Sequence, residues 1–406
     1  MVVACLRLAR RGSGISARRT HWQTMAEVLE INDPEELAPF RWQWNDLAKR
    51  TPGVSFFHTF DWFSTYWTHF GDDTRLRVLL VHEGQQALGI VPLVVRTRRH
   101  RVGNVRVLGY PLDNWGSFFG PIGPDTSGAL SIAFAHLMRT RRDWDLIELA
   151  AVDALGNDRG RTAAAMAQEG LAPLTEPWHT ASLVDLAGTC DWEQYWATRT
   201  SRWRNNVRRS EKLLAARGEV TYVRYRPGGI SARETDPRWD LYYQCEQIAR
   251  ASWQGSSQSG TTLTHDSIRS FLRDCHRVAA RVGALDLNLL LLNGQAVAFN
   301  YAYHFAGYVY GLRTGYDAQA AREGAGTVLQ RRMIEDSFAR GDHTYDLGPD
   351  YLECKRHWQT EARESYRYTH FAAEPVAQLA RVKRGIGRWL SATRGSKRAA
   401  AAAVAS

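Results

Sequence analysis

The sequence predicts a mixed α/β fold that occurs twice in one chain, and three observations support this prediction. The length of 406 residues exceeds what a single hydrophobic core usually holds. Strand-forming runs alternate with helical segments, which is typical of a sheet flanked by helices. A strand–turn–strand unit, a glycine-containing loop, a helix and a short strand occur in each half, about 200 residues apart. We therefore expect two tandem domains with the same plan.

The first copy begins with two aliphatic, β-branched runs around a glycine-containing turn, at residues 76–96. Residues 123–149 follow with a helix and a short strand near Trp144-Asp145-Leu146. An aromatic stretch, residues 56–71 (FFHTFDWFSTYWTHFG), precedes the copy. We expect Trp62, Phe63 and Trp67 to pack in the core and between the domains, with stacking on a ligand as the alternative.

The second copy repeats the strand–turn–strand pattern at residues 285–305, and its turn at 293–295 aligns with the turn at 83–85. It is followed by AREGAGTVLQ (321–330), a helix, and a strand at Tyr345-Asp346-Leu347. Other elements are expected on the same grounds: strands at 181–186, 219–226 and 365–372, a long helix at 190–217, and helices at 236–252 and 265–282 joined by a polar linker.

Charge separates the ends of the chain from its body. Residues 1–24 hold five arginines and residues 376–406 hold seven Lys or Arg, with no acid in either segment. The formal net charge of +10 lies there, so the body is close to neutral and nucleic acid is not the expected partner. We divide the chain into a basic, disordered tail (1–24), a degenerate N-terminal domain (25–185), a C-terminal domain with the presumed active site (186–375) and a basic tail (376–406). Translation begins at either Met1 or Met25.

Cysteine usage and hydropathy predict a cytoplasmic protein without a metal. The five cysteines are scattered and form no C-x-x-C pair, which argues against a disulfide framework and a zinc site. No segment approaches the roughly 20 apolar residues needed to span a bilayer. Apolar residues between Leu379 and Leu390 recur at helical spacing among basic residues. This segment is expected to dock on the domain or fray, or else to rest on the inner face of an anionic membrane.

Four segments carry a resemblance to a known family. They are residues 56–71, RWRNNVRRSEKLLAARGEV (202–220), YDAQAAREGAGTVL (316–329) and YDLGPDYLECKRHW (345–358). In this order they resemble the GNAT acyltransferase fold, duplicated as in the FemAB-like tandem proteins. More closely, residues 40–372 are similar to the CelD-like family, which is named for cellulose or exopolysaccharide biosynthesis. The resemblance implies an acyl-CoA, such as acetyl-CoA, as co-substrate.

The glycine loop at 321–330 is the cofactor-binding candidate. A GNAT loop reads Q/R-x-x-G-x-G/A, and its backbone N–H groups hold the coenzyme A pyrophosphate at a helix N-terminus. Gly324 and Gly326 fit this pattern, whereas Ala321 stands where Gln or Arg is expected and Glu323 adds a negative charge. The predicted cofactor-binding residues are Arg322, Gly324, Ala325, Gly326 and Thr327. The alternative is a tight turn before an ordinary helix.

Amine acylation needs a base, an oxyanion donor and an acid for the leaving thiolate. Asp346 is the candidate base, or else it holds the following turn through backbone N–H groups. Asn300 is the candidate oxyanion donor, on the opposite strand face from Tyr301 and Tyr303. Tyr351 is the candidate acid, with a packing role as the alternative.

Glu246, Trp253 and Lys355 are the predicted substrate-binding residues. The resemblance places Glu246 and Trp253 beside the acceptor cleft, and Lys355 matches a lysine of the family pattern. The helix at 202–217 carries six Lys or Arg and one Glu, so it either attracts an anion or forms a solvated charged face.

These observations favour an acyl-CoA-dependent N-acyltransferase, most simply an N-acetyltransferase, acting on an amine of an amino sugar or related acceptor in exopolysaccharide or cell-envelope metabolism. One alternative is a FemAB-like transferase that uses aminoacyl-tRNA as donor. A second is a non-catalytic scaffold that binds a glycan or a synthase.

Overall fold

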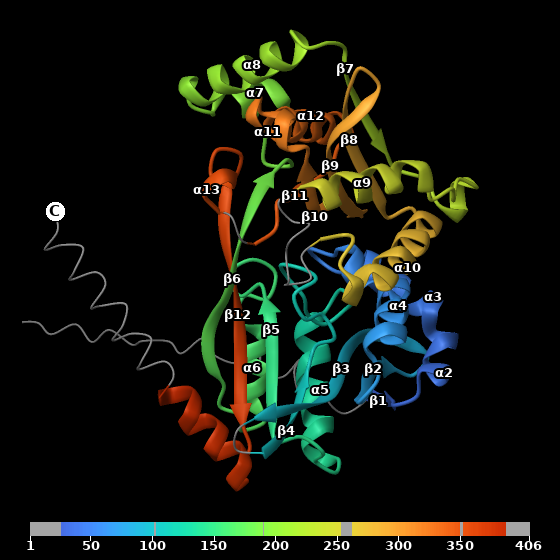
Figure 1. The fold of residues 1–406 in the computed structure, drawn as a ribbon. Coiled ribbons are helices and arrows are strands. Elements are labelled where there is room, and N and C mark those ends of the chain that lie inside the picture. Colours follow the sequence, from blue (N-terminus) through green and yellow to red (C-terminus); the bar gives the residue numbers. More distant parts are fainter. Residues whose placement is uncertain (1–25, 101–102, 190, 253–261, 350–351, 387–406) are drawn as a thin grey trace, which may run out of the picture.

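One mixed sheet runs through both halves of the molecule. The computed structural model describes residues 26–386, apart from 101–102, 190, 253–261 and 350–351. Its 12 strands lie in the order β1-β2-β3-β4-β5-β12-β6-β11-β10-β9-β8-β7. The first half of the chain therefore forms one end of the sheet and the second half forms the other (Figure 1).

The first half contains five strands and the helices that cover them. Aliphatic and β-branched residues fill the central strands, and consecutive side chains are buried because both faces of the sheet are covered. The strands are β1 (Ala26–Ile31), β2 (Thr74–Glu83), β3 (Gln86–His100), β4 (Gly103–Gly109) and β5 (Leu146–Val152); the helices are α2 (Pro34–Leu37), α3 (Arg41–Lys49), α4 (Phe60–Phe70), α5 (Thr126–Arg139) and α6 (Arg161–Gln168).

The second half repeats this plan. Its strands are β7 (Val220–Tyr225), β8 (Leu285–Leu292), β9 (Gln295–Phe305), β10 (Tyr308–Tyr316) and β11 (Thr344–Asp346); its helices are α7 (Trp192–Ala197), α8 (Ser201–Ala215), α9 (Trp239–Ala251), α10 (Asp266–Val282), α11 (Ala318–Arg322), α12 (Ala325–Ala339) and α13 (Leu352–Lys355). In both halves an antiparallel three-strand unit ends in a parallel contact of three residues, β4 with β5 and β10 with β11. The predicted mixed α/β fold with two copies of one plan is confirmed.

Two long strands join the halves. β6 (Leu174–Asp185) follows the first half in sequence but pairs with β11 of the second half, and β12 (Glu361–Phe371) pairs with β5 of the first half. β6 and β12 also pair with each other, from Leu183 to Leu174 on β6. Each half thus donates its last strand to a shared centre, so the two halves cannot separate without breaking the sheet.

The helix predicted at 190–217 is two helices. α7 ends at Ala197, and Thr200 caps α8, because its hydroxyl accepts a hydrogen bond from Trp203 N–H (3.2 Å). A threonine in this position satisfies an N–H group that the helix leaves free. α7 therefore packs its aromatic side chains beside α12, while α8 can follow its own direction.

The aromatic stretch at 56–71 packs in the core, as predicted. Trp62 and Phe63 are almost fully buried, and Trp67 packs against the same core. Phe56 and Phe57 contact Tyr303 of β9, with ring centroids 4.6 and 5.9 Å apart. This contact joins the N-terminal half to the sheet of the second half.

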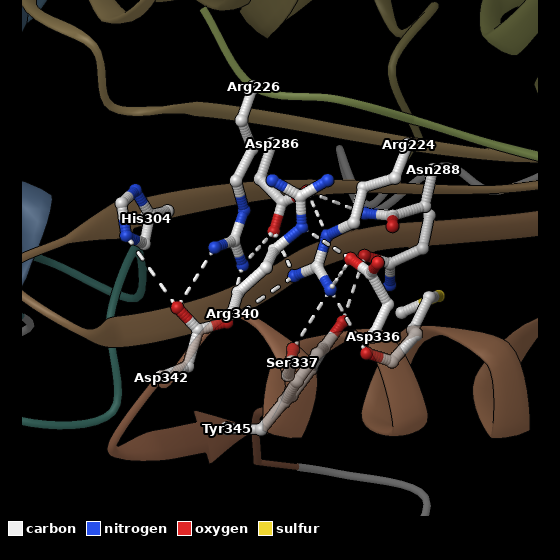
Figure 2. A network of polar contacts seen from close by, with 12 residues as sticks. Arg224, Arg226, Asp286, Asn288, His304, Asp336, Ser337, Arg340, Asp342 and Tyr345 are labelled. Carbon is white, nitrogen blue, oxygen red and sulfur yellow. Dashed lines mark hydrogen bonds and ion pairs between the residues drawn. The ribbon is translucent and has the colours of Figure 1, made fainter. Parts of the chain in front are cut away.

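A buried ionic network fixes α12 against β7 and β8 (Figure 2). Arg224 and Arg226 on β7 both bind Asp286 on β8, at 2.7 and 2.9 Å. The Asp286 side chain has no exposed surface, and those of Arg224 and Arg226 are 2 and 8% exposed. Arg224 also donates to the Met333 carbonyl in α12, at 3.0 Å. Burial alone would raise the pKa of Asp286, but the two guanidinium groups lower it well below its usual range.

The C-terminal segment forms a helix over residues 375–386 within the described chain. It docks through Ala377 and Ala380, which are buried, whereas Leu379, Val382 and Ile386 remain more than half exposed. The predicted membrane contact of this exposed stripe stays a prediction, which binding to anionic vesicles would test. Among the described residues, no helix is long and apolar enough to cross a bilayer.

The buried network predicts a large stability difference between two substitutions. Asp286→Ala should lower the free energy of unfolding by about 3–5 kcal/mol, because it removes the fully buried carboxylate that Arg224 and Arg226 share and leaves them only Asp336 and Asp342. Arg340→Ala removes a partly exposed ion pair with Asp336 and should cost less than about 1 kcal/mol. Urea unfolding of both variants measures the difference, and equal costs would contradict the role of the network.

Candidate functional site

The two parallel strands of the second half separate after a short contact. Tyr308–Tyr310 of β10 pairs with Thr344–Asp346 of β11, and then the strands diverge. β10 continues along β9 to Tyr316, with a bulge at Leu312, while the chain beyond β11 turns at Gly348, where φ is +82°. We call this opening between β10 and β11 the splay. A ligand that enters the sheet can reach backbone groups there.

Asp346 lies at the narrow end of the splay and is fully buried. The Tyr308 hydroxyl donates to one carboxylate oxygen, and the Gly348 N–H donates to the other, both at 2.7 Å. Burial raises the pKa of Asp346, although these donors and the Ser117 hydroxyl favour the charged form. The bond from Gly348 N–H shows that Asp346 holds the turn after β11, which was the alternative role for this residue. A raised pKa also suits a group that takes up a proton near neutral pH.

Lys355 stabilises the same turn. Its ammonium group donates to the carbonyl oxygens of Gly348 and Pro349, at 3.0 and 2.7 Å, and its charge also favours ionised Asp346. The substrate-binding role that we expected for Lys355 is untested. Tyr351, the candidate acid, lies outside the described residues.

Asn300 faces α12 across β9, on the opposite side from Tyr301 and Tyr303, as the strand alternation predicts. Its amide N–H donates to the Thr314 hydroxyl at 2.8 Å, and its carbonyl oxygen lies 3.5 Å from the Tyr345 hydroxyl. Asn300 is 4% exposed, so it is a satisfied polar group beside the splay. Its role as an oxyanion donor stays a prediction.

The glycine loop forms the N-terminus of α12. Gly324 is the N-cap, with φ of +87°, and its N–H donates to the Ala321 carbonyl at 3.0 Å. The next three N–H groups, those of Ala325, Gly326 and Thr327, have no acceptor within the described residues, and no side chain caps the helix. The Gly324 N–H is therefore bonded within the loop, and the other three N–H groups can bind an anion.

Close contacts require glycine at position 324 and leave little space for a side chain at Gly326. A Cβ atom on Gly324 would lie 2.2 Å from Ser210 Oγ of α8, and one on Gly326 would lie 3.1 Å from the Tyr316 ring. Tyr316 ends β10, so the N-terminus of α12 lies beside the wide end of the splay. This arrangement brings the three N–H groups and the diverging strands together.

The charge near the N-terminus of α12 favours an anion more than the sequence suggested, because the nearby acid is paired. Glu323 is paired with Arg217 at 2.7 Å, which neutralises the carboxylate beside the loop. Arg322 is exposed at the end of α11. Residues 202–217 hold six basic residues, of which Arg217 is the last. Five of them form no ion pair within the described residues: Arg202, Arg204, Arg208, Arg209 and Lys212. Helical spacing places Arg202 and Arg209 on one exposed stripe of α8.

Glu246 is buried among arginines. Its carboxylate pairs with Arg273 (2.9 Å), Arg269 (3.3 Å) and Arg250 (3.5 Å), and its side chain is 4% exposed. This cluster joins α9 to α10, so Glu246 has a structural role in addition to any contact with an acceptor. Trp253, its predicted neighbour at the cleft, lies outside the described residues.

The tandem resemblance implies a first half that shapes the substrate cleft, and the structure places residues beside this site that the sequence analysis did not single out. Residues 113–119, which we call the interdomain loop, lie against the splay from the N-terminal half. Trp115 stacks on Arg313 of β10, with the guanidinium carbon 5.6 Å from the ring centroid, and Ser117 faces Asp346. Phe118 packs against Ala181 of β6. In the sequence, the signal that could have drawn attention to Arg313 is a single charged residue within the strand-forming segment YVYGLRTGY.

The Gly324 contact predicts a sharp difference between two glycines of positive φ. Gly324→Ala should cost about 2–4 kcal/mol of stability, because it adds left-handed strain and a clash with Ser210. Gly341→Ala has φ of +72° and open space, so it should cost about 1–2 kcal/mol. Thermal or urea unfolding measures both.

A Ser210→Gly background provides the control for this comparison. It removes the clashing atoms, so Gly324→Ala in that background should cost no more than Gly341→Ala does. If the cost is unchanged, the contact between α8 and the loop does not determine the need for glycine.

Comparisons with known proteins identify this arrangement. A family model described as "Acetyltransferase (GNAT) domain" matches residues 201–356, which span α8 to α13. No curated protein sequence matches the chain significantly. The matched segment contains the splay, the glycine loop and the basic face of α8.

Solved structures extend the likeness to both halves. FemX aligns with a TM-score of 0.58 and 12% identity, over 87% of this chain and 99% of its own. The C-terminal domain of a putative lysylphosphatidylglycerol synthetase from Agrobacterium fabrum aligns with a TM-score of 0.50 and 11% identity, over 84 and 95%. A tandem GNAT protein from the clavulanic acid biosynthesis pathway aligns with a TM-score of 0.43 and 13% identity, over 86 and 99%. The chain thus has a mixed α/β fold with two copies of one plan, a fold that it shares with FemX, and residues 201–356 of the second copy match a GNAT acetyltransferase domain model.

Proposed function

We propose that the protein is an acyl-CoA-dependent N-acyltransferase that transfers an acyl group, most simply acetyl, to an amine of an amino sugar or related acceptor. The observation that supports this proposal best is the uncapped N-terminus of α12 beside the splay. Its three free N–H groups suit the pyrophosphate of coenzyme A. In this proposal the exposed cations Arg202 and Arg209 of α8, the helix that meets the loop at Ser210, attract the phosphates.

The splay gives the acyl group a route to Asp346. In this proposal the thioester lies between β10 and β11, where unpaired backbone groups of β10 can hold it. The amine of the acceptor forms a bond to the carbonyl carbon, the carbon–sulfur bond breaks, and the thiolate leaves. Asp346 takes the amine proton directly or through a water molecule. Asn300 and Tyr351 stay proposals for the oxyanion donor and for the acid that protonates the thiolate.

Access to Asp346 requires movement of the interdomain loop. Ser117 is 2% exposed and Asp346 is fully covered, so an acceptor amine reaches the carboxylate only when this loop shifts. The first half would then act as a partner domain that shapes the acceptor cleft. An exopolysaccharide or cell-envelope acceptor, as in the CelD-like family, stays part of the proposal.

Binding of acetyl-CoA tests the donor. Calorimetry with the full chain should show binding, and Arg202→Ala/Arg209→Ala should weaken it by about tenfold, since two cations near the phosphates contribute about 1–2 kcal/mol together. Arg381→Ala/Lys383→Ala removes the same charge from the C-terminal helix and should leave the affinity unchanged. Absence of binding at millimolar acetyl-CoA would overturn the proposal.

The pH profile tests Asp346. Because burial raises its pKa, the basic form is present only above that raised value, so kcat/KM should rise with pH through a pKa above the ordinary 3.8 of an aspartate. Asp346→Asn should lower kcat/KM by about 10²–10⁴-fold and remove this limb. Asp145→Asn, in the corresponding strand region of the first half, should keep the profile. A profile unchanged in Asp346→Asn would exclude Asp346 as the base.

A FemAB-like transferase is the second candidate, because five cations of α8 lack an acidic partner among the described residues and could contact an RNA backbone. Binding of the two donors to the full chain distinguishes the candidates, since both assign the cations of α8 to donor binding. If aminoacyl-tRNA binds in a salt-dependent way and acetyl-CoA does not, the second candidate replaces the first.

A further inference from the structure

Arg313 is a partly buried cation that has no counterion within the described chain. It follows the bulge of β10, and its Nε atom is buried without a hydrogen-bond acceptor. One terminal nitrogen donates to the Leu312 carbonyl at 2.8 Å. No carboxylate among the described residues forms an ion pair with Arg313, and burial lowers its pKa. Covering a guanidinium group without a carboxylate costs several kcal/mol.

The two arginines with almost no exposed side-chain surface are paired with carboxylates. Arg77 binds Glu30 and Asp143, at 2.8 and 2.7 Å, and Arg224 binds Asp286. In both residues a carboxylate balances the buried charge. Arg313 differs from them, because no carboxylate among the described residues pairs with it and its free nitrogens lie beside the splay.

The surroundings of Arg313 form a wall that suits a planar ion pair. Trp115 covers one face of the guanidinium, and Phe271 of α10 packs on Trp115 with ring centroids 4.7 Å apart. The nearest acid on the interdomain loop, Asp113, is already held by Arg96 at 2.9 Å and by the Tyr66 hydroxyl. An arginine held flat on an aromatic ring presents its nitrogens to a carboxylate or phosphate in a fixed geometry.

The position of Arg313 relates this cation to the proposed acceptor. Trp115 faces Arg313 and Ser117, two residues later, faces Asp346, so one short loop contacts both side chains. Arg313 also lies three residues beyond Tyr310, the last residue of β10 that pairs with β11. A molecule that presents an amine to Asp346 can thus extend toward Arg313 along the interdomain loop.

We infer that Arg313, supported by Trp115, binds an oxyanion of the acceptor, so that the acceptor is an amine that also carries a carboxylate or a phosphate. This inference rests on the proposed acyltransferase function, because it assigns a second contact to the same acceptor. An amino sugar would satisfy it as its phosphate ester or as its uronic acid.

Binding to three matched probes tests the inference without requiring turnover. Glucosamine, glucosamine 6-phosphate and 2-amino-2-deoxyglucuronic acid share the amine, and only the last two carry an oxyanion. In calorimetry, at least one of the two probes with an oxyanion should bind the wild type about tenfold or more tightly than glucosamine does. The probe that binds more tightly shows whether the site prefers a phosphate or a carboxylate. Arg313→Gln should remove this preference, and Arg313→Lys should restore only part of it, because a lysine lacks the bidentate geometry.

The melting temperature provides a second test, because loss of an arginine that stabilises the fold would lower it. Arg313→Gln should keep or raise the melting temperature, because it removes an unpaired cation, whereas Arg77→Gln should lower it by breaking two ion pairs. Equal binding of the three probes, an unchanged preference in Arg313→Gln, or a melting temperature that falls as far as in Arg77→Gln would each overturn the inference.

The acetyl-CoA experiment separates this inference from the proposed function. If acetyl-CoA binds but oxyanion probes show no preference, the donor assignment stands and the Arg313 site is wrong. If the oxyanion preference is present but acetyl-CoA does not bind, Arg313 keeps its assignment and the acyl-CoA donor is wrong.

Discussion

The position of α12 depends on the buried contact of Arg224 and Arg226 with Asp286. These side chains connect β7, β8 and the C-terminal half of α12, so the helix cannot slide along the sheet. At its other end, Gly324 contacts Ser210 of α8 without space for a side chain. Because both ends are fixed, the N-terminal amides of α12 stay beside the wide end of the splay. The candidate cofactor site is therefore a consequence of core electrostatics and close packing.

The shared centre of the sheet has a comparable effect on the acceptor side. β6 and β12 cross between the halves, and the interdomain loop consequently lies against β10 and β11. A single GNAT-like domain would leave Asp346 and Arg313 open on that face. Duplication provides a cover that excludes water from Asp346 and raises its pKa. The same cover supplies Trp115, so the first half contributes to the site although its own loop has a single glycine near the helix start.

Local patterns were sufficient for much of the fold and for part of the site. The aliphatic runs and glycine turns predicted β2, β3, β8 and β9, and the strand alternation placed Asn300 opposite Tyr301. The glycine loop was correctly placed at a helix N-terminus, since positive φ and close approach both require glycine there. The break between α7 and α8 was missed. In the sequence, Thr200 could be an ordinary helix residue, and only the structure shows that its hydroxyl caps a new helix.

The sequence by itself determined the two copies, the order of their elements and the charged face of α8, since these follow from periodicity and composition. Only the tertiary structure decided which charges are neutralised. It paired Glu323 with Arg217 and surrounded Glu246 with arginines, while it left Arg313 without a carboxylate among the described residues. The physical reason is that ion pairs and burial depend on distances between segments that lie far apart in the chain, and local sequence patterns contain no information about those distances.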